Sequence, residues 1–398
     1  SKKGNNLRVH FIGIGGIGLS ALARFLNFVG HSVSGSDMKS SSITKELEKE
    51  GIKVSCPQEA KNISDDLDLV IYSAAVTDEN PELIEARLKQ IRTLSRKEAL
   101  PIILGDKKNY CVAGAHGKST TTAILATILQ SSALIGAISK EFGSNFRYVD
   151  KTVAFEADES DASFLLSNPY CAIVTNAEPE HMEYYHYDYD KFYESYETFL
   201  SLAKKRVVNG EDKDIQKLKI EDATYLYPSK DIKNLCYTLK DGQPCTKFDL
   251  KDYGTFEVWG FGFHIASNAS LAIMAALNEL DIETIRKNLL SYKGIKKRFD
   301  IVQSNEIFVV IDDYAHHPTE IRATLESAKN YPHNELWCVF QPHTYSRTIA
   351  FLDDFAKALS LCDHVIVTDI YAAREKDTGI VSSKDIVDRM ADYDVDVH

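Results

Sequence analysis

The sequence lacks the features that mark disulfide-rich, secreted and membrane proteins. None of its 7 cysteines forms a CxxC pair, and several lie inside apolar runs, so we expect small core residues of a reduced protein. No apolar run approaches the roughly 20 residues that span a bilayer, and the polar start at residues 1–6 precedes no signal-peptide core. These absences predict a cytoplasmic chain without membrane insertion.

Positive charge is also scarce. The chain has 46 Lys and Arg against 58 Asp and Glu, which gives a net charge of -12 at pH 7. Such a chain is poorly suited to neutralise the phosphates of nucleic acids or anionic lipids, so we expect no nucleic-acid partner. If the substrates are anions, the cations that bind them must be concentrated locally.

The chain shows no internal repeat of the kind that builds solenoids, and its 398 residues are too many for one hydrophobic core. Short apolar runs alternate with helical patterns, which predicts parallel sheets covered by helices. We expect an α/β fold of three successive α/β domains, at residues 1–105, 106–297 and 298–398. Strands are predicted at 7–13, 31–36, 69–73, 110–113, 152–157, 171–176, 307–312, 336–341 and 364–368, helices at 19–29 and 266–280, and irregular structure at 205–255.

A glycine-rich segment at residues 113–122, AGAHGKSTTT, lies between an expected strand and an expected helix. Glycines let backbone N–H groups turn toward an anion, and the helix N-terminus adds partial positive charge. Lys118 can reach the β- and γ-phosphates of a nucleotide, and Ser119 can bind Mg²⁺. Val112 stands where the usual GxxxxGK[ST] pattern has a glycine. The segment predicts a phosphate-binding loop.

A second glycine-rich turn lies near the start of the chain. Residues 13–18, GIGGIG, fit the pattern GxGxxG after a strand and before a helix, and Asp37 ends the next expected strand. This pattern places a diphosphate at a helix N-terminus and an acid near a ribose. It permits an NAD-type dinucleotide and equally a UDP-sugar. The other phosphate loop favours the UDP-sugar, because hydride transfer has no need of that loop.

Polar side chains follow two successive expected strands beyond the phosphate loop. Residues 156–161, EADESD, contain four carboxylates, and Glu178, Glu180 and His181 follow the next strand. Ligands of open α/β sheets bind beyond the carboxyl ends of the strands, and Mg²⁺ prefers oxygen ligands. The two clusters therefore predict a Mg²⁺ site near the bound nucleotide.

These segments resemble those of one family. The loop GAHGKSTT has the form found in Mur ligases and folylpolyglutamate synthases, and EADESDASF, TNAEPEHMEYY, GFHIASNA, DDYAHHPTE and QPHTYSRT follow in the order of the Mur ligases. The resemblance runs from Val9 to about Val381. It implies a Rossmann-like UDP-binding domain, a P-loop-type central ATPase domain and a Rossmann-like C-terminal domain. It is greatest to the members that join L-alanine to UDP-N-acetylmuramate.

Carried over position by position, the resemblance implies a role for each matching residue. UDP-substrate binding is implied for Gly15, Gly16, Ile17, Gly18, Ser36, Asp37 and Ser73. ATP binding is implied for Gly114, Ala115, His116, Gly117, Lys118, Ser119, Thr120, His264, Asn268, Arg298 and Asp313, and amino-acid binding for Tyr314, His343 and Arg347. Two Mg²⁺ ions are implied, the first bound by Ser119 and the second by Glu159 and His181, with Glu156 nearby. Catalytic roles are implied for Lys118, Glu159, His181 and Arg298.

The reaction implied is ATP-dependent ligation of L-alanine to UDP-N-acetylmuramate through an acyl phosphate, in peptidoglycan synthesis. Its products would be UDP-N-acetylmuramoyl-L-alanine, ADP and phosphate, and the enzyme would be a monomer or weak homodimer. The alternatives are another Mur-type ligase such as the murein tripeptide-recycling ligase, an NAD-dependent oxidoreductase, and a non-catalytic nucleotide-binding protein. Because the sequence stops at His398, earlier than Mur ligases usually do, we expect a short or truncated third domain.

Overall fold

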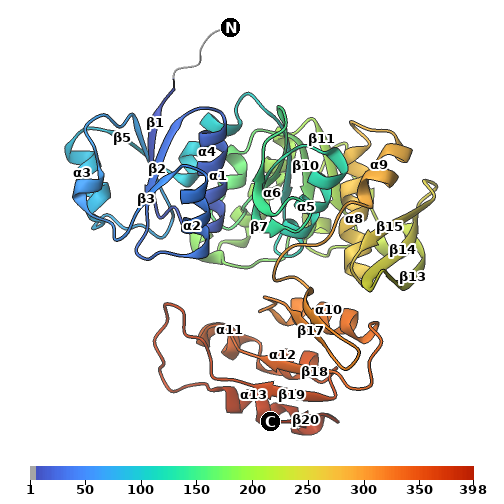
Figure 1. Cartoon of the computed structure of the whole chain (residues 1–398). Coiled ribbons are helices and arrows are strands. Elements are labelled where there is room, and N and C mark those ends of the chain that lie inside the picture. Colours follow the sequence, from blue (N-terminus) through green and yellow to red (C-terminus); the bar gives the residue numbers. More distant parts are fainter. Residues whose placement is uncertain (1–5) are drawn as a thin grey trace. The chain divides into compact units, whose positions relative to one another are not determined.

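The computed structural model describes residues 6–398, so the first five residues of the predicted first domain lie outside it. The described chain forms two compact units. The first unit holds the residues up to 231 together with 268–295, and the second holds 232–267 together with 296–398 (Figure 1). None of the helices in this described part combines the length and the apolar character that crossing a bilayer requires.

A five-stranded sheet with the order β3-β2-β1-β4-β5 opens the first unit. All its strands are parallel, and β1 pairs with both β2 and β4. The winding direction changes between β1 and β4, and ligands of such sheets bind at this point, beyond the carboxyl ends of the strands. The elements are β1 (Arg8–Ile12), α1 (Ile17–Phe28), β2 (Ser32–Ser36), α2 (Ser42–Lys49), β3 (Lys53–Ser55), β4 (Leu69–Tyr72), α3 (Pro81–Leu88), β5 (Arg92–Ser95) and α4 (Arg96–Leu104).

The two faces of this sheet pack against different helices. Alternate residues of a strand point to opposite faces, so Val9 and Phe11 lie on one face and Ile12 on the other. Val9 and Phe11 share a buried core with residues of α1, α2 and α4, such as Leu22. Ile12 packs in a second, smaller core with Leu83 of α3. Helices therefore cover both faces, as in a doubly wound fold.

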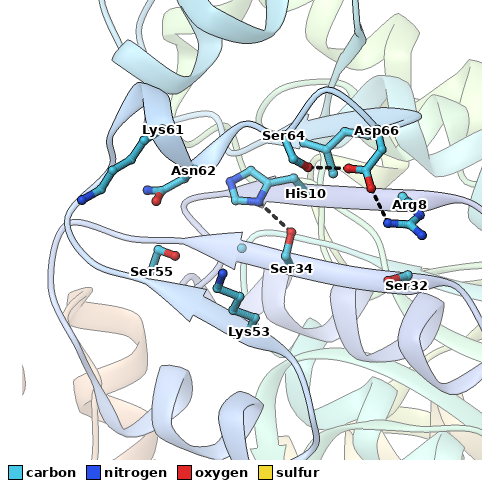
Figure 2. A pocket seen from close by; sticks show the side chains of 12 residues that line it. Arg8, His10, Ser32, Ser34, Lys53, Ser55, Lys61, Asn62, Ser64 and Asp66 are labelled. Atoms are coloured by element: carbon cyan, nitrogen blue, oxygen red, sulfur yellow. Dashed lines mark hydrogen bonds and ion pairs between the residues drawn. The ribbon is translucent and has the colours of Figure 1, made fainter.

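On the α3 side, strands β1, β2 and β3 line a polar pocket of about 270 Å³ (Figure 2). His10 and Ser34 lie in its floor, with His10 Nδ1 2.8 Å from Ser34 Oγ. The other ring nitrogen of His10 lies 2.6 Å from Glu82, a fully buried acid of α3. Glu82 also accepts a hydrogen bond of 2.7 Å from the hydroxyl of Ser36. A buried polar network therefore joins α3 to β1 and β2.

The second sheet of the first unit has seven strands in the order β12-β11-β10-β6-β9-β7-β8. All neighbours pair in parallel except β7 and β8. Because β6 lies between β10 and β9, the loops that follow these three strands leave the sheet at the same edge. The elements are β6 (Lys108–Ala113), α5 (Lys118–Leu129), β7 (Ser132–Ser139), β8 (Ser144–Arg147), β9 (Thr152–Glu156), β10 (Pro169–Val174), α6 (Tyr189–Leu202), β11 (Lys205–Asn209), β12 (Thr224–Leu226), α7 (Pro228–Asp231), α8 (Phe263–Ala276) and α9 (Ile282–Leu289).

Asn145 of β8 fixes the second sheet against α1. Its Nδ2 donates hydrogen bonds of 2.6 Å to the carbonyl of Ile17 and 3.0 Å to Ser20 Oγ. Its Oδ1 accepts a hydrogen bond from Arg24, which also pairs with Glu50 at 2.9 Å. The start of α1, where the first glycine-rich turn ends, is therefore held by a side chain of the second sheet.

The second unit contains shorter sheets. β13 (Ile232–Lys240), β14 (Gln243–Leu250) and β15 (Thr255–Trp259) form an antiparallel sheet, and β16 (Asp300–Ser304) pairs with β17 (Val309–Asp312). β18 (Trp337–Phe340), β19 (His364–Val367) and β20 (Asp396–Val397) are parallel. The helices are α10 (Pro318–Lys329), α11 (Tyr345–Ala350), α12 (Leu352–Leu359) and α13 (Ser383–Arg389). Phe355, Leu359 and Val365 are fully buried in a core of this unit.

The predicted irregular structure at 205–255 is wrong. This stretch contains β11 and β12 of the second sheet and most of the antiparallel sheet β13-β14-β15. β13 is exposed along most of its length, so no buried face marks it as a strand. The predicted strands and helices elsewhere are present, with ends shifted by a few residues.

Candidate functional site

The phosphate loop leaves β6 after Ala113 and enters α5 at Lys118. Gly114 has a φ of +146°, and a methyl group there would lie 1.9 Å from Thr175 Oγ1. Asn176, after β10, accepts hydrogen bonds from the backbone N–H groups of Ala115 at 2.9 Å and His116 at 3.2 Å. The loop is therefore held in shape by the strand beside it, and only glycine fits at position 114.

Lys118 faces the acidic segment that follows β9. Its Nζ lies 3.2 Å from both carboxylate oxygens of Glu159 and 3.8 Å from Asp158. Burial opposes the charge on Lys118, but the carboxylates of Glu159, Asp158 and Glu156 outweigh it and raise the pKa of the ammonium. Burial also raises the pKa of Glu159, against the effect of Lys118. Lys118 therefore stays cationic and can pass from these acids to a phosphate.

Ser119, the next residue of α5, donates a hydrogen bond from its hydroxyl to Glu156. The same oxygen of Glu156 accepts a hydrogen bond of 3.1 Å from the N–H of Gly136. The hydroxyl and the carboxylates at positions 156, 158 and 159 are hard oxygen donors, the kind that Mg²⁺ prefers. This donor set fits a Mg²⁺ ion. Thr120 follows in the same first turn of α5.

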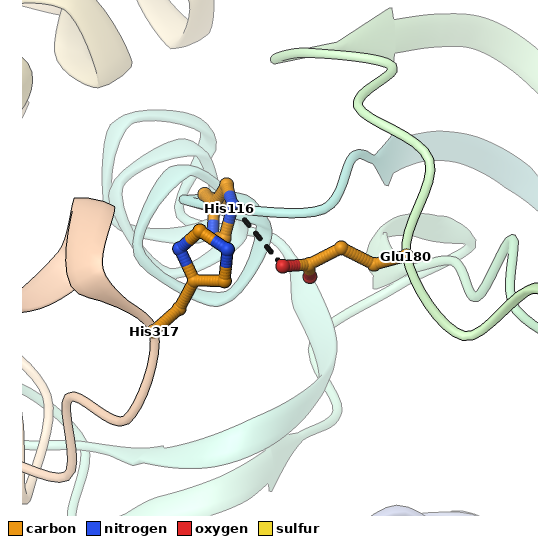
Figure 3. Close-up of side chains that lie close together, drawn as sticks. All are labelled: His116, Glu180 and His317. Atoms are coloured by element: carbon orange, nitrogen blue, oxygen red, sulfur yellow. Dashed lines mark ion pairs between the residues drawn. The ribbon is translucent and has the colours of Figure 1, made fainter. Parts of the chain in front are cut away.

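The second predicted cluster lies beyond β10. His116 Nε2 lies 3.0 Å from a carboxylate oxygen of Glu178 and 3.6 Å from one of Glu180, as Figure 3 shows for Glu180. These contacts tie the phosphate loop to the segment after β10. His181 is exposed, has a φ of 52°, and makes no hydrogen bond or ion pair with any residue between 6 and 398. The structure therefore does not bring His181 together with Glu159, and a metal-binding role for His181 stays a prediction.

Asn268, in the part of α8 that belongs to the first unit, lies behind the phosphate loop. A methyl group at Gly117, whose φ is +81°, would lie 2.8 Å from Asn268 Oδ1. His264, which is also predicted to bind ATP, lies one turn earlier in α8 and is exposed. The geometry therefore supports Asn268 as a neighbour of the phosphate loop.

The first glycine-rich turn follows β1 at the switch point of its sheet. Gly13 has a φ of +85°, and a methyl group there would lie 2.7 Å from Ser73 Oγ, at the end of β4. Asp37 accepts a hydrogen bond of 2.7 Å from the N–H of Gly15. Gly16 precedes α1, so Ile17 and Gly18 lie in its first turn. The structure brings these predicted UDP-binding residues together.

Ser36 is the exception among the predicted UDP-binding residues. Its side chain is fully buried, and its hydroxyl donates to Glu82 rather than facing the turn. Its carbonyl accepts hydrogen bonds from the N–H groups of Gly13 at 2.9 Å and Ile14 at 3.0 Å. Ser36 therefore shapes the glycine-rich turn, and direct contact with a substrate stays a prediction.

In the second unit, Asp313 follows β17, and its carboxylate already accepts hydrogen bonds from neighbouring residues. It accepts hydrogen bonds from the N–H groups of Phe299 at 3.0 Å and Ala315 at 2.8 Å, and from Thr324 Oγ1 at 2.7 Å. Burial raises the pKa of Asp313 despite these hydrogen bonds. Arg298 pairs with Glu320 at 3.6 Å. Both predicted ATP-binding residues therefore have structural partners within their own unit.

The predicted amino-acid residues of the second unit lie together. Nη1 of Arg347 lies 3.1 Å from Nδ1 of His343, and the rings of Tyr314 and His343 are 6.5 Å apart. A guanidinium can only donate, so His343 Nδ1 must accept and the imidazole is neutral. Burial and the charge of Arg347 both lower the pKa of His343, in agreement with this assignment. The planar guanidinium suits a carboxylate ligand.

Sequence reasoning missed three kinds of residue at this site. The sequence places Asn176 only at a strand end and predicts no role for Glu82 or for the pair Arg96-Lys97. The available signal for the last pair is its position directly after β5, at the edge where the loops of β1 and β4 also emerge. Cations at that edge are candidates for binding an anion.

Comparison with known families gives consecutive matches along the chain. The model described as "Mur ligase family, catalytic domain" matches residues 8–108, "Mur ligase middle domain" matches 112–276, and "Mur ligase, glutamate ligase domain" matches 297–398. The predicted fold class of three successive α/β domains is thereby confirmed, while the predicted domain boundaries stay a prediction.

Curated relatives include "UDP-N-acetylmuramate--L-alanine ligase" of Campylobacter curvus, 54% identical over 93% of this chain and 86% of the relative. The protein of the same name from Helicobacter pylori strain P12 is 49% identical over 92% of this chain and 83% of its own. Among solved structures, the UDP-N-acetylmuramate-alanine ligase MurC of Thermotoga maritima matches with a TM-score of 0.85 at 30% identity, covering 98% of this chain and 90% of that one.

A murein peptide ligase from Psychrobacter arcticus shares the fold, with a TM-score of 0.67 at 23% identity over 98% of this chain and 90% of that one. The matched models together span nearly all of the sequence, and the curated relatives are similar over most of it. The chain therefore belongs to the Mur ligase family.

Proposed function

We propose that this chain joins L-alanine to UDP-N-acetylmuramate, converting ATP to ADP and phosphate. The observation that carries the proposal is the phosphate loop with Lys118 beside the carboxylates of Asp158 and Glu159. Relatives about half identical over most of the chain bear the name of this activity, which supports the choice of substrates.

The reaction would proceed in two steps. A carboxylate oxygen of the muramoyl group attacks the γ-phosphorus of ATP, and ADP leaves. The amine of L-alanine then attacks the acyl carbon, phosphate leaves, and the nitrogen loses a proton as the amide forms. The protein contributes mainly position and charge, because phosphoryl transfer requires little covalent chemistry from it.

Lys118 would leave its ion pair with Glu159 and bind the transferred phosphoryl group instead. The N–H groups of the loop at 114–118 and the start of α5 would bind the other phosphates. We propose that Ser119, with Glu156 beside it, binds the first metal ion. Glu159 and His181 would bind the second metal ion. Mg²⁺ supplies positive charge that balances the phosphates when bound.

In the second unit, Arg347 would bind the carboxylate of the amino acid, with His343 and Tyr314 around it. We propose further that Arg298 and Asp313 contact the nucleotide and that His264 and Asn268 lie near its base. The protein would act in the cytoplasm as a monomer or weak homodimer.

Phosphate release tests this function directly. Wild-type protein is assayed with ATP, Mg²⁺ and UDP-N-acetylmuramate, and with L-alanine, glycine, L-serine or a murein tripeptide added singly. We expect release to require both the UDP-linked acid and L-alanine. Phosphate release that requires the tripeptide in place of L-alanine would instead identify a recycling ligase. Binding of NAD by a protein that releases no phosphate would identify an oxidoreductase.

Isotope transfer tests the intermediate. When the muramoyl carboxylate is labelled with ¹⁸O, an acyl phosphate route places one labelled oxygen in the released phosphate. Unlabelled phosphate accompanied by full amide formation would reject this route.

A further inference from the structure

Glu375 is a partly buried acid of the second unit, and none of the roles above includes it. It lies in the segment that follows β19. Because β18 and β19 are parallel neighbours, the segments that follow them leave the sheet at the same edge. The two segments also touch: the N–H of Thr344 donates a hydrogen bond of 2.8 Å to the carbonyl of Tyr371, and His343 pairs with Tyr371 in an isolated parallel bridge. Glu375 therefore belongs to the loop beside the predicted amino-acid residues.

The turn between His343 and α11 has a strained backbone. Thr344 has a φ of +68° and a ψ of 147°, a combination that is common only for glycine. Such a conformation persists where the surrounding structure holds it in place. Arg347 lies three residues further along, in the first turn of α11. The course of the chain at Thr344 therefore sets where the side chain of Arg347 starts.

The carboxylate of Glu375 holds this turn from outside. Its Oε1 accepts hydrogen bonds from the N–H groups of Tyr345 at 2.7 Å and Ser346 at 3.0 Å, and its Oε2 accepts one from the hydroxyl of Ser346. The first N–H groups of a helix have no partner within the helix, and negative charge is favourable at that end. The bond from the Ser346 hydroxyl, the two backbone bonds and the charge of Arg347 lower the pKa of Glu375 below its ordinary 4.5, against the effect of burial. Glu375 is therefore ionised at neutral pH.

The same turn fixes the guanidinium of Arg347. Its Nη1 lies 3.1 Å from Nδ1 of His343 and donates a hydrogen bond of 3.3 Å to the carbonyl of His343. His343 and Arg347 lie on either side of the strained residue Thr344. A change in the backbone at Thr344 would therefore move both of these side chains.

We propose that Glu375 is a positioning residue for the amino-acid substrate, an assignment that rests on the proposed function. Its carboxylate holds the turn at Thr344, and the turn places Arg347 and His343 where the carboxylate of an α-amino acid would bind. Both carboxylate oxygens of Glu375 are already engaged by residues of α11. Glu375 therefore acts through Arg347 and does not itself contact the substrate.

The test is steady-state phosphate release by wild-type protein and by E375A, E375D, E375Q and D281A, with each substrate varied in turn. Asp281 is a matched control, because its carboxylate also caps a helix: it accepts a hydrogen bond of 2.8 Å from the N–H of Thr284 at the start of α9, in the first unit. We expect E375A to raise KM for L-alanine about 10-fold, because a displaced guanidinium binds the substrate carboxylate less well. KM for ATP and for UDP-N-acetylmuramate should change less than about twofold, and D281A should leave all three values near those of wild type.

The conservative variants separate the hydrogen bonds of Glu375 from its charge. E375Q keeps an oxygen that can accept from both N–H groups, so its KM for L-alanine should stay within about threefold of wild type. E375D is one methylene shorter and should resemble E375A. If E375A does not fold, as judged by thermal unfolding, E375D provides the same comparison.

Three outcomes would overturn the proposal for Glu375. The first is a KM for L-alanine that rises no more in E375A and E375D than in D281A. The second is an equal rise in the KM values of all three substrates, which would show a general loss of structure. The third is a rise in E375Q as large as that in E375A. If wild-type protein releases no phosphate in response to L-alanine, the proposed function fails instead.

Discussion

The Nζ of Lys118 lies 3.2 Å from each carboxylate oxygen of Glu159. Lys118, the cation that we expect to bind the phosphates of ATP, is thus already paired with Glu159 of the adjacent loop. In the proposed function, nucleotide binding exchanges this partner for a phosphate, and the freed carboxylate would then be available to a cation. The same few side chains can therefore account for both nucleotide and metal binding.

Lys118→Ala should lower kcat for ATP-dependent ligation by about 10²- to 10³-fold, because one positive charge is lost where negative charge moves in the transition state. Lys205→Ala, at an exposed position that begins β11, should retain wild-type activity. Steady-state phosphate release by both variants measures the effect. Activity of the Lys118 variant within twofold of wild type would remove Lys118 from the mechanism.

Gly114→Ala should abolish detectable ATP binding, because its methyl group would lie 1.9 Å from Thr175 Oγ1 and force the loop to move. Gly143→Ala is the control: that glycine also has a positive φ, +67°, but nothing lies within 4 Å of the added methyl group. It should cost only about 1 kcal/mol of stability through backbone strain. Calorimetric titration with ATP and thermal unfolding separate the two effects. Equal ATP affinity in both variants would show that the loop tolerates a side chain at 114.

Arg347→Ala should raise KM for L-alanine about 10- to 100-fold and leave KM for ATP unchanged, since a charged hydrogen-bonded pair with the substrate carboxylate would be lost. Arg347→Lys should recover only part of the affinity, because an ammonium cannot form the paired contact. Arg322→Ala, a more exposed arginine on α10, serves as control. A parallel rise in both KM values would indicate a structural role for Arg347.

Glu82→Gln should destabilise the protein by about 2 kcal/mol at pH 7, because Glu82 is a buried carboxylate hydrogen-bonded to His10, Ser36 and Asn62. Although burial opposes ionisation, these hydrogen bonds lower the pKa of Glu82 below its ordinary 4.5. The folded state thus binds the proton less tightly than the unfolded chain does. The stabilisation is present above about pH 4.5 and is lost as the pH falls through the lowered pKa.

Urea unfolding at pH 7 and at pH 4 therefore should show a smaller difference between wild type and Glu82→Gln at the lower pH. Glu79→Gln, at an exposed position before α3, should match wild type at both pH values. A difference for the Glu82 variant that grows on acidification would mean that its pKa is raised in the folded state.

The sequence by itself determined the features that are local along the chain. Three features depend on short stretches of consecutive residues: the phosphate loop, the first glycine-rich turn and the α/β alternation. The backbone preferences of such stretches do not require distant parts of the chain. The order of the motifs identified the family. The antiparallel sheet β13-β14-β15 escaped prediction, because its first strand is exposed along most of its length and so lacks a buried apolar face.

Only the tertiary structure decided which side chains meet. Glu159 reaches Lys118 across 41 residues, and Ser36 turns its hydroxyl to Glu82 across 46, because neighbouring elements of one fold bring them together. No motif in the sequence includes Arg96, and its place beside Gly18 follows from the strand order of the first sheet. Strand order is set by long-range packing, which no short stretch of sequence contains.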